Sequence, residues 1–416
     1  MKPDTTNRTP PSRYTMMGLM LIALLLCYID RTIISVAAIE MQKELGWSDS
    51  QKGFVLSVFY AGYLLMQLLG GLLSNRFGGR NVYLFCVFVW SLTTVLTPIA
   101  AYASFAALIV ARVALGLGEG ATYPASYNLI NSWMPVEERS RSVGLISSAA
   151  AIGTVGALLV TGKLIESFGW PFVFYLFGSM GFAWCLFWFM MIPARSPGEE
   201  LQNQQSSTGE RNKTPWKTLL THPSVVTLYV VNFGGQSITF LMAAWLPSYF
   251  VDTFGATTTQ AGMYAILPWV VLSIVTYAAG HYTDKRIEAG EESLALRKRL
   301  LRYGFMLVIL SLAAMTLGPS LALSIFLVLL IFSGVGILIP VFSTIPSELL
   351  PRHSDILFGF LCAVGALGSV VFVSGAGILL DITGSYNATF LAVAGACVVS
   401  LTTFQVFGST TEIEEA

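Results

Sequence analysis

The sequence predicts an all-helical integral membrane protein with twelve transmembrane helices. The chain of 416 residues is 55% hydrophobic and only 11% charged, with a mean hydropathy of +0.69, whereas an average soluble domain carries about a quarter charged residues. Its apolar residues form blocks of roughly 20, the length at which a helix spans the hydrocarbon core of a bilayer. The alternating ten-residue strands typical of a membrane β-barrel do not occur in the sequence.

The apolar blocks form two sets of six, separated by a long polar segment. We expect the first six spans near 15–38, 53–73, 81–102, 105–132, 142–166 and 171–192, and the second six near 224–250, 259–281, 302–319, 322–349, 355–380 and 386–407. Residues 193–223, rich in Gln, Ser and charge, are expected to form a flexible cytosolic linker. The predicted domains are therefore a tail (1–14), a six-helix bundle (15–192), the linker, a second bundle (224–407) and a C-terminal tail (408–416).

The basic residues are distributed unevenly between the two sides that twelve spans define. With both termini in the cytosol, 18 of the 23 Lys and Arg residues lie in the tails and inner loops, and three (Lys43, Lys52 and Lys163) lie in outer loops. The other two lie within spans. This imbalance agrees with the positive-inside rule, so we expect cytoplasmic termini. The polar N-terminus has no small-residue cleavage site before the first full-length span, which argues against a removed signal peptide.

Two short motifs at half-chain spacing indicate an internal repeat. Each follows the second span of its half and has a glycine, then Asn or Asp four residues later, then a base. The copies are "GLLSNRFGGR", with Gly71, Asn75 and Arg76, and "GHYTDKR", with Gly280, Asp284 and Lys285. An ordinary basic inner loop would explain either copy alone. Two copies 209 residues apart predict two pseudo-symmetric copies of one six-helix unit, with both motifs in loops that take part in gating.

This layout resembles the major facilitator superfamily, in which the loop after the second span typically has the pattern G-x-L-x-D-R-x-G-R-R. The resemblance covers nearly the whole chain, but Asn75 stands where the family usually has Asp, which leaves Asp284 as the stronger copy. Five segments are similar to the anion:cation symporter branch, which includes sialin, the vesicular glutamate transporters and bacterial D-galactonate and hexuronate transporters. These segments are YIDR (28–31), PVEERSR (135–141), FGWPFVFY (168–175), AWLPSYF (244–250) and DKRIEAGEESLALRKR (284–299).

Four charged residues lie deep in the predicted spans. Asp30 and Arg31 are adjacent in the first span, and Arg112 and Glu119 lie about two turns apart on one face of the fourth. An ionised residue near mid-bilayer costs roughly 2.5 to 3.5 kcal/mol, so it normally faces a partner or a water-filled cavity. Permanent ion pairs between the two spans are one interpretation, but buried ion pairs stabilise less than apolar packing. The second half has no charge at comparable depth.

The functional hypothesis follows from the balance of these charges. With all four groups ionised, each arginine can be satisfied by a resident carboxylate, and an incoming organic anion has to compete. Burial and the nearby arginines act in opposite directions on the acids, which favours proton exchange at Asp30 and Glu119. Protonation would free a cation, so we expect Arg31 to bind the substrate carboxylate. The resemblance implies the same proton carriers, with Arg31 and Arg112 handling the anion and its coupling.

Polar residues of other spans complete the candidate substrate site. The resemblance places Tyr28 in the lining of the site and Asn232 where the D-galactonate type has a substrate-contacting glutamine. Gln236, one turn further, is the residue expected to take over that contact. Ser237, together with Ser343 and Thr344 on the tenth span, offers groups that suit hydroxyls better than carboxylates.

Small residues in the spans have a structural interpretation. Glycines 116, 118 and 120 let another helix backbone, or a ligand, approach the face of the fourth span closely. Cysteines occur at 27, 86, 185, 362 and 397, all within predicted spans, and show no ligand spacing. We expect them to behave as small hydrophobes, and we expect no metal and no cofactor.

These features predict a proton-coupled symporter that imports a small organic anion, a sugar acid or related carboxylate, by alternating access of its two halves. Its partners are the anion, protons and the lipid bilayer, and one chain with both halves is expected to work as a monomer. The zero formal net charge gives no support for nucleic-acid binding. The short first outer loop (39–52) favours a bacterial inner membrane, because animal members of the branch tend to have a long loop there.

Other functions on the same fold stay open. An anion exchanger or exporter is the main alternative, with either an organic anion or phosphate as substrate, because arginine binds both. Drug export is disfavoured, since "AAAIGTVGALL" (149–159) lacks the proline of the G-P-x-x-G-G pattern of drug antiporters. No phosphate-binding loop, metal-ligand cluster or Ser/His/Asp arrangement supports an enzyme.

Overall fold

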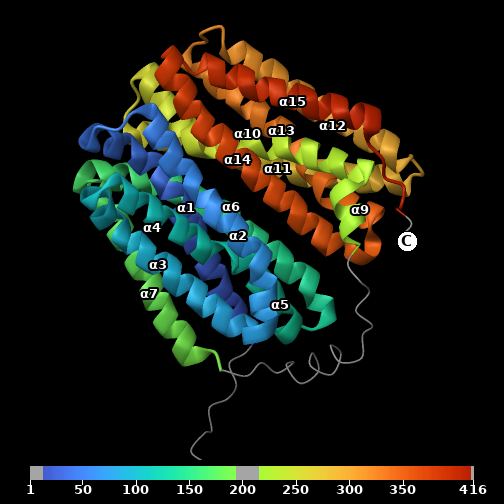
Figure 1. Cartoon of the computed structure of the whole chain (residues 1–416), viewed down its shortest axis with the longest axis horizontal. Coiled ribbons are helices and arrows are strands. Elements are labelled where there is room, and N and C mark those ends of the chain that lie inside the picture. Colours follow the sequence, from blue (N-terminus) through green and yellow to red (C-terminus); the bar gives the residue numbers. More distant parts are fainter. Residues whose placement is uncertain (1–12, 194–214, 414–416) are drawn as a thin grey trace, which may run out of the picture.

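The computed structural model describes residues 13–193 and 215–413, and every regular element in these ranges is a helix. The first half contains α1 (Arg13–Leu45), α2 (Asp49–Phe77), α3 (Gly79–Ala103), α4 (Phe105–Gly120), α5 (Thr122–Trp133), α6 (Val136–Phe168) and α7 (Trp170–Met191). The second half contains α9 (Trp216–Thr221), α10 (Pro223–Phe254), α11 (Thr258–Glu288), α12 (Ser293–Met315), α13 (Leu321–Leu349), η1 (Pro351–His353), α14 (Ser354–Thr383) and α15 (Asn387–Phe407). Each half forms its own bundle (Figure 1).

The twelve predicted spans all coincide with helices of this set, with α4 and α5 together forming the fourth. Among the described residues, ten segments are long and apolar enough to cross a membrane. The helix α2 is the eleventh when Asp49–Gln67 and Leu69–Phe77, bent by 48°, count as one span. The remaining helix, α12, begins nine residues earlier than predicted and carries four basic residues in its first ten positions. The all-helical membrane architecture is therefore confirmed.

Helix ends follow local sequence rules. Gly255 and Gly384, both with positive φ, end α10 and α14, because glycine adopts this backbone conformation without steric cost. Four helices begin with a hydroxyl that accepts a hydrogen bond from the backbone N–H three residues later, which satisfies one of the free donors of the first turn. These caps are Ser48, Ser104, Thr257 and Ser320.

Two predicted loops are helical instead. The motif residues Gly71, Asn75 and Arg76 lie in the last two turns of α2, and Gly280, Asp284 and Lys285 lie in the last three turns of α11. Both helices continue through the motif because neither segment contains a proline. The polar residues of each motif lie close to the end of the helix. In the predicted linker, residues 194–214 lie outside the described ranges, whereas 216–221 form the short helix α9.

Glycines bring α4 close to its neighbours, as the sequence predicted. A Cβ atom added at Gly116 would lie 2.1 Å from the carbonyl oxygen of Phe59, and one at Gly120 would lie 2.5 Å from that of Tyr63. Gly118 faces α3 instead, where its added Cβ would lie 2.9 Å from the backbone nitrogen of Trp90. The close approach is therefore confirmed, and its partners are the helices α2 and α3.

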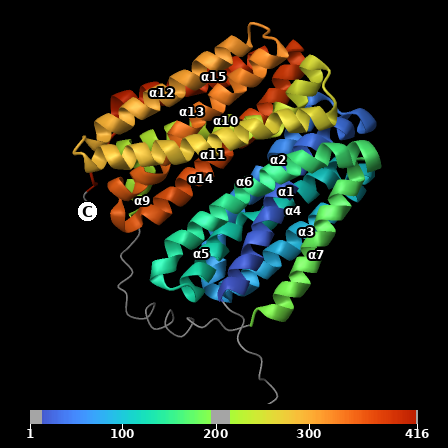
Figure 2. The same ribbon diagram turned by 180° about the vertical axis from the view of Figure 1, so that it is seen from behind.

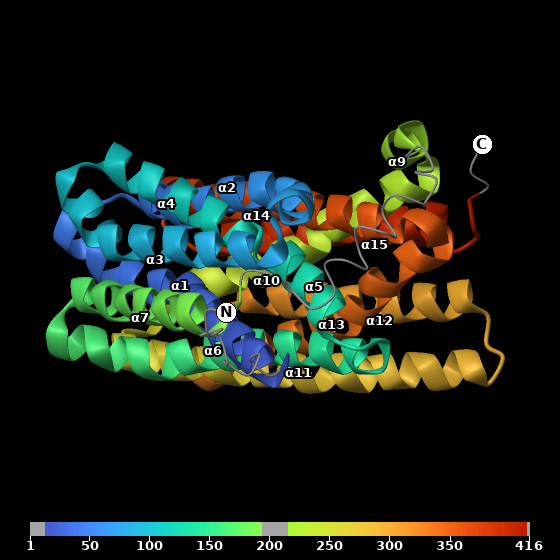
Figure 3. The same cartoon turned by 90° about the horizontal axis from the view of Figure 1, so that it is seen from below.

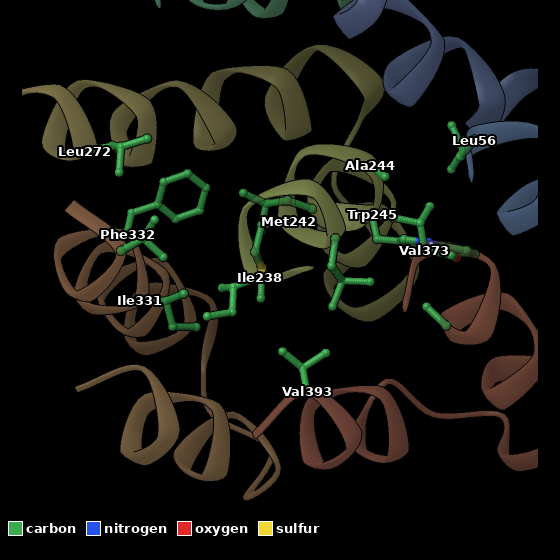
Figure 4. Packing of buried hydrophobic residues seen from close by; sticks show 14 of the residues in the cluster. Leu56, Ile238, Met242, Ala244, Trp245, Leu272, Ile331, Phe332, Val373 and Val393 are labelled. Atoms are coloured by element: carbon green, nitrogen blue, oxygen red, sulfur yellow. Dashed lines mark hydrogen bonds between the residues drawn. The ribbon is translucent and has the colours of Figure 1, made fainter. Parts of the chain in front are cut away.

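The second bundle has an apolar core and, among its described residues, a buried arginine near the start of α12. Ile238, Met242 and Trp245 of α10 point into this core (Figure 4), and the indole nitrogen of Trp245 donates to the carbonyl oxygen of Val373 at 3.0 Å. Arg297 near the start of α12, outside the predicted span 302–319, is only 2% exposed. It forms an ion pair with Glu348 and donates to Thr344, so Thr344 is part of this pair's surroundings.

The halves converge at the end of the molecule where α1 ends and α2 begins, which we call the tight end. The opposite end, where α2 ends and α10 begins, is called the linker end. Figure 2 shows α11 beside α6, and Figure 1 shows α2 beside α14. Lys52, predicted in an outer loop, is instead 1% exposed in the first turn of α2, with its ammonium 4.7 Å from the ring centre of Trp245 across the boundary. Seen from below, the helices run nearly along the long axis (Figure 3).

Candidate functional site

The structure joins two of the four deep charges in a buried ion pair between α1 and α4. Arg31 donates from Nε at 3.1 Å and from Nη2 at 2.7 Å, and both bonds reach Oε2 of Glu119. The Glu119 side chain is fully buried, and that of Arg31 is 13% exposed. Both groups lie in the first bundle, so the pair is a contact within one half of the molecule.

Three aromatic rings surround the guanidinium of Arg31. Its central carbon lies 4.9 Å from the ring centre of Tyr28, 5.1 Å from that of Phe59 and 4.7 Å from that of Tyr63. A cation over an aromatic face gains about 0.5 to 2 kcal/mol, with the larger values where water is excluded. The rings therefore compensate part of the cost of burying this cation, whether or not Glu119 is charged.

Arg112 has a different environment from the one predicted. It is 2% exposed, and its Nε donates to the carbonyl oxygen of Val55 at 3.3 Å. Its guanidinium also lies over the ring of Phe59, at 5.3 Å. Within the described chain it forms no ion pair, and its Nη1 has no hydrogen-bond partner. The expectation that each arginine is satisfied by a resident carboxylate is therefore wrong for Arg112, because Asp30 bonds elsewhere.

Asp30 is buried at 2% exposure and accepts a hydrogen bond from the hydroxyl of Thr94, on α3, at 3.2 Å. Its Oδ1 is buried without a partner among the described residues, as is Oε1 of Glu119. Buried polar groups are nearly always hydrogen-bonded, and one that is not costs about 1 to 3 kcal/mol. Both acids therefore have an oxygen that can take up a proton or a further polar contact.

Several residues of this site were not predicted from the sequence. Phe59 and Tyr63 lie one turn apart on α2, a spacing that puts both rings on the same face of a helix. Thr94 belongs to a cluster of threonines on α3, and Tyr123 shares a hydroxyl hydrogen bond of 3.0 Å with Tyr28. The helical spacing of Phe59 and Tyr63 was a pattern in the sequence that could have identified these two rings.

The candidate residues of the second half lie around a separate pocket. Asn232, Gln236 and Ser343 line it together with apolar side chains of α10, α13 and α14. The amide of Asn232 is already bonded, since it donates to the carbonyl oxygen of Leu361. Ser237 is fully buried and donates to the carbonyl oxygen one turn back on its own helix, so it is not part of the lining. In the described chain, no hydrogen bond or ion pair joins this pocket to the four charges.

The motif residues at the linker end have few polar contacts. Asn75 accepts a hydrogen bond from the side chain of Asn128 at 3.2 Å, which ties α2 to α5 within the first half. A gating role of Asn75, Asp284 and the other motif residues stays a prediction. All five cysteines are free, and the described residues contain no group of three His, Cys, Asp or Glu side chains suited to a metal.

Two pseudo-symmetric six-helix bundles, the first with four buried charged residues, define a membrane transporter that works without enzymatic chemistry. A family model bears this out. The chain belongs to the Major Facilitator Superfamily, whose model matches residues 20–354.

Relatives of known name span nearly the whole chain. A protein from Oryza sativa subsp. japonica, "Probable anion transporter 4, chloroplastic", is 33% identical over 99% of this chain and 72% of its own length. Two proteins from Arabidopsis thaliana are each 30% identical over 96% of this chain. One is an "Ascorbate transporter, chloroplastic", of which 75% is covered, and the other is a "Sodium-dependent phosphate transport protein 1, chloroplastic", of which 80% is covered.

Solved structures share the fold. A bacterial homologue of the human lysosomal transporter Spinster, in an inward-facing and occupied conformation, superposes with a TM-score of 0.80. The match covers 96% of this chain and 97% of that one at 18% sequence identity. The two chains therefore share their architecture.

Proposed function

We propose that this protein is a proton-coupled symporter that imports a small organic anion, and that the Arg31–Glu119 pair is its coupling element. The observation that carries the proposal is that Arg31 is held by a single carboxylate, fully buried, inside a ring of three aromatic faces. An incoming anion and Glu119 would compete for the same guanidinium. The names of the relatives, which include anion and ascorbate transporters, support an anion as substrate.

The proposed cycle uses protonation to release the arginine. When Glu119 takes up a proton, it loses its charge and its hold on Arg31 weakens. The cation keeps its aromatic neighbours and gives its two donors to the substrate, since planar guanidinium groups bind carboxylates bidentately. Proton and anion are then bound together, and the halves rock about the site so that both leave on the other side.

Asp30 and Arg112 are proposed as a second pair of groups in the same cycle. Each has a buried polar atom without a partner in the described structure, and Phe59 touches both arginines. A substrate or a second proton at this position would satisfy these atoms. Asp30 is therefore a proton carrier in the proposal, and Arg112 stabilises negative charge next to it.

A sugar acid is the substrate class that fits the second half. Gln236 and Ser343 line a pocket with mostly apolar neighbours and no charged lining residue. Amides and hydroxyls of this kind bind hydroxyl groups, whereas the carboxylate of the same molecule would go to Arg31. With cytoplasmic termini and a bacterial inner membrane, as the sequence indicates, the tight end would face the outside of the cell.

Anion exchange or export, including that of phosphate, is the second candidate. A guanidinium binds phosphate as well as carboxylate, and one relative carries a sodium-dependent phosphate transport name. Competition between Glu119 and the anion at Arg31 would also permit exchange of one anion for another without proton flow.

Uptake by purified protein in liposomes separates these functions. A panel of labelled sugar acids, other carboxylates and phosphate is offered under an inward proton gradient, an inward sodium gradient, or no gradient. The proposal predicts that one organic acid accumulates about tenfold per pH unit when one proton enters with each monovalent anion. The accumulation should collapse when the proton gradient is dissipated.

Protein-free liposomes are the control for leakage. Accumulation of phosphate driven by sodium would contradict the proposal. Rapid exchange of preloaded anion, with no gradient-driven uptake of any solute in the panel, would contradict it as well and would establish the second candidate.

A further inference from the structure

The tight end contains two interfaces between the halves that repeat each other position by position. In one, α14 packs against the start of α2, and in the other, α6 packs against the start of α11. Residues of α2 and α11 correspond at a spacing of 209, and residues of α6 and α14 correspond at a spacing of 215. At both places an acid of one half bonds to the start of a helix in the other half, and glycines let the helices meet.

A carboxylate from one half caps a helix of the other half at each interface. Asp381 accepts the backbone N–H of Asp49 and that of Ser50, both at 2.9 Å. Glu166, the counterpart of Asp381, accepts the backbone N–H of Thr259 at 2.9 Å and its hydroxyl at 2.7 Å. Ser50 and Thr259 are themselves 209 residues apart, so the bond to the second amide of the helix is the same at both interfaces.

The capped helices are prepared for these acids in the same way. Ser48 and Gln51 form a capping box at the start of α2, and Thr257 and Gln260 form one at the start of α11. A capping box satisfies the third amide of the helix and leaves the first two free. The acid of the other half binds in this region, where the positive end of the helix dipole also favours a carboxylate.

Glycines let the helix backbones meet beside each acid. Gly377, one turn before Asp381, would place an added Cβ 2.1 Å from the carbonyl oxygen of Asp49. Gly162, one turn before Glu166, would place it 2.6 Å from the Cα atom of Thr259. Any larger side chain at either glycine would push the halves apart.

A second pair of glycines repeats the relation one turn deeper. An added Cβ at Gly53 of α2 would lie 3.0 Å from the carbonyl oxygen of Val373, and one at Gly262 of α11 would lie 2.6 Å from that of Leu158. All four residues keep the 209 and 215 spacings. The repeat therefore extends from the helix ends into the membrane-spanning part.

We propose that Glu166 and Asp381 form two copies of one latch, which holds the halves together at the tight end and opens at both interfaces at once. Each latch consists of an acid, the first turn of the helix that it caps and the glycine one turn before the acid. Both acids are exposed, so the bonds can be exchanged for water at low cost when the end opens. This gate is distinct from the charge cluster, because none of its bonds involves those four residues.

The two copies have different neighbours. Lys52 of α2 lies over the ring of Trp245 in the other half, whereas the equivalent position in α11 is Ala261. The latch of Asp381 therefore has an additional cation–π contact. We expect it to be the stronger of the two.

Hydrogen exchange of the purified full-length protein, without substrate or gradient, tests the latch. Peptides that cover the first turns of α2 and α11 report the protection of the capped amides. In Glu166→Ala the amide of Thr259 in α11 loses its acceptor, and the proposal predicts that the distant α2 amides also exchange about threefold to tenfold faster. This range corresponds to the free energy of a hydrogen bond to a charged group, which is smaller here because both acids are exposed. Asp381→Ala should have the converse effect on α11.

The cross-effect separates a gate from two independent helix caps. Faster exchange confined to the mutated interface, or unchanged exchange at both, would overturn the proposal. Glu288→Gln, an exposed acid at the linker end, is the control and should leave both peptides unchanged. Gly377→Val tests the same gate by steric means and should expose the amides of both interfaces. Failure of anion symport would leave this measurement unaffected, so the two proposals are tested separately.

Discussion

Glu119→Gln is expected to abolish proton-driven accumulation of the substrate while leaving anion exchange in place. Glutamine has the shape of the protonated acid but cannot release a proton, so Arg31 stays permanently free to bind the anion. In the native pair, Arg31 donates twice to one oxygen of a fully buried carboxylate. Separating such a pair costs about 3 to 5 kcal/mol. This corresponds to at least about 100-fold in the equilibrium between the paired arginine and the arginine that is free to bind the anion.

The measurement compares accumulation under a proton gradient with exchange of labelled for unlabelled anion. We expect accumulation to fall to the level of protein-free liposomes, and the apparent affinity for the anion to depend less on pH than in the wild type. Glu138→Gln is the matched control, because it removes an acid from an ion pair with Arg13 that is partly exposed, and such pairs contribute little. Gradient-driven accumulation at the wild-type level in Glu119→Gln would contradict the proposed coupling.

Arg31→Gln is expected to weaken anion binding by about 100-fold or more, in uptake and in exchange alike. The variant removes the cation that would hold the substrate carboxylate, and a glutamine amide has neither the charge nor the forked donors of a guanidinium. Binding is measured from the concentration dependence of exchange. Arg31→Lys should recover only part of the affinity, since a lysine keeps the charge but not the bidentate geometry.

Loss of binding in Arg31→Gln has misfolding as a second explanation, because this variant leaves Glu119 buried without a partner. The double variant Arg31→Gln, Glu119→Gln removes both charges and leaves two neutral amides that can bond to each other. We expect the double variant to fold and still fail to bind the anion. Recovery of binding in the double variant would show that Arg31 only neutralises Glu119 and does not contact the substrate.

The helices and the repeat could be predicted from the sequence because they depend on segment length and spacing. Apolar blocks of about 20 residues set the spans, and the 209-residue offset between Gly71 and Gly280 indicated two equivalent halves. The depth of Asp30, Arg31, Arg112 and Glu119 followed from their place in these blocks. The glycines of α4 also indicated close helix contacts, which the structure confirms.

The partners of these charges could not be predicted, because they depend on how each helix is rotated about its axis. A helix that is apolar on all sides gives no periodic pattern that fixes this rotation. The pairing of Arg31 with Glu119, the isolation of Arg112 and the rings of Phe59 and Tyr63 therefore emerged only from the structure. The role of the latch acids could not be predicted either, because Glu166 and Asp381 are polar residues at helix ends and the sequence does not show which helix start each of them meets.

The number of protons that enter with each anion is the sharpest test of proton-coupled symport through Glu119. Liposomes with wild-type protein and a pH-sensitive dye inside are given an inward gradient of the labelled anion and no pH gradient. Symport predicts acidification of the lumen in a fixed ratio to anion entry, and loss of this acidification in Glu119→Gln. Anion entry into wild-type liposomes without any proton movement would contradict it.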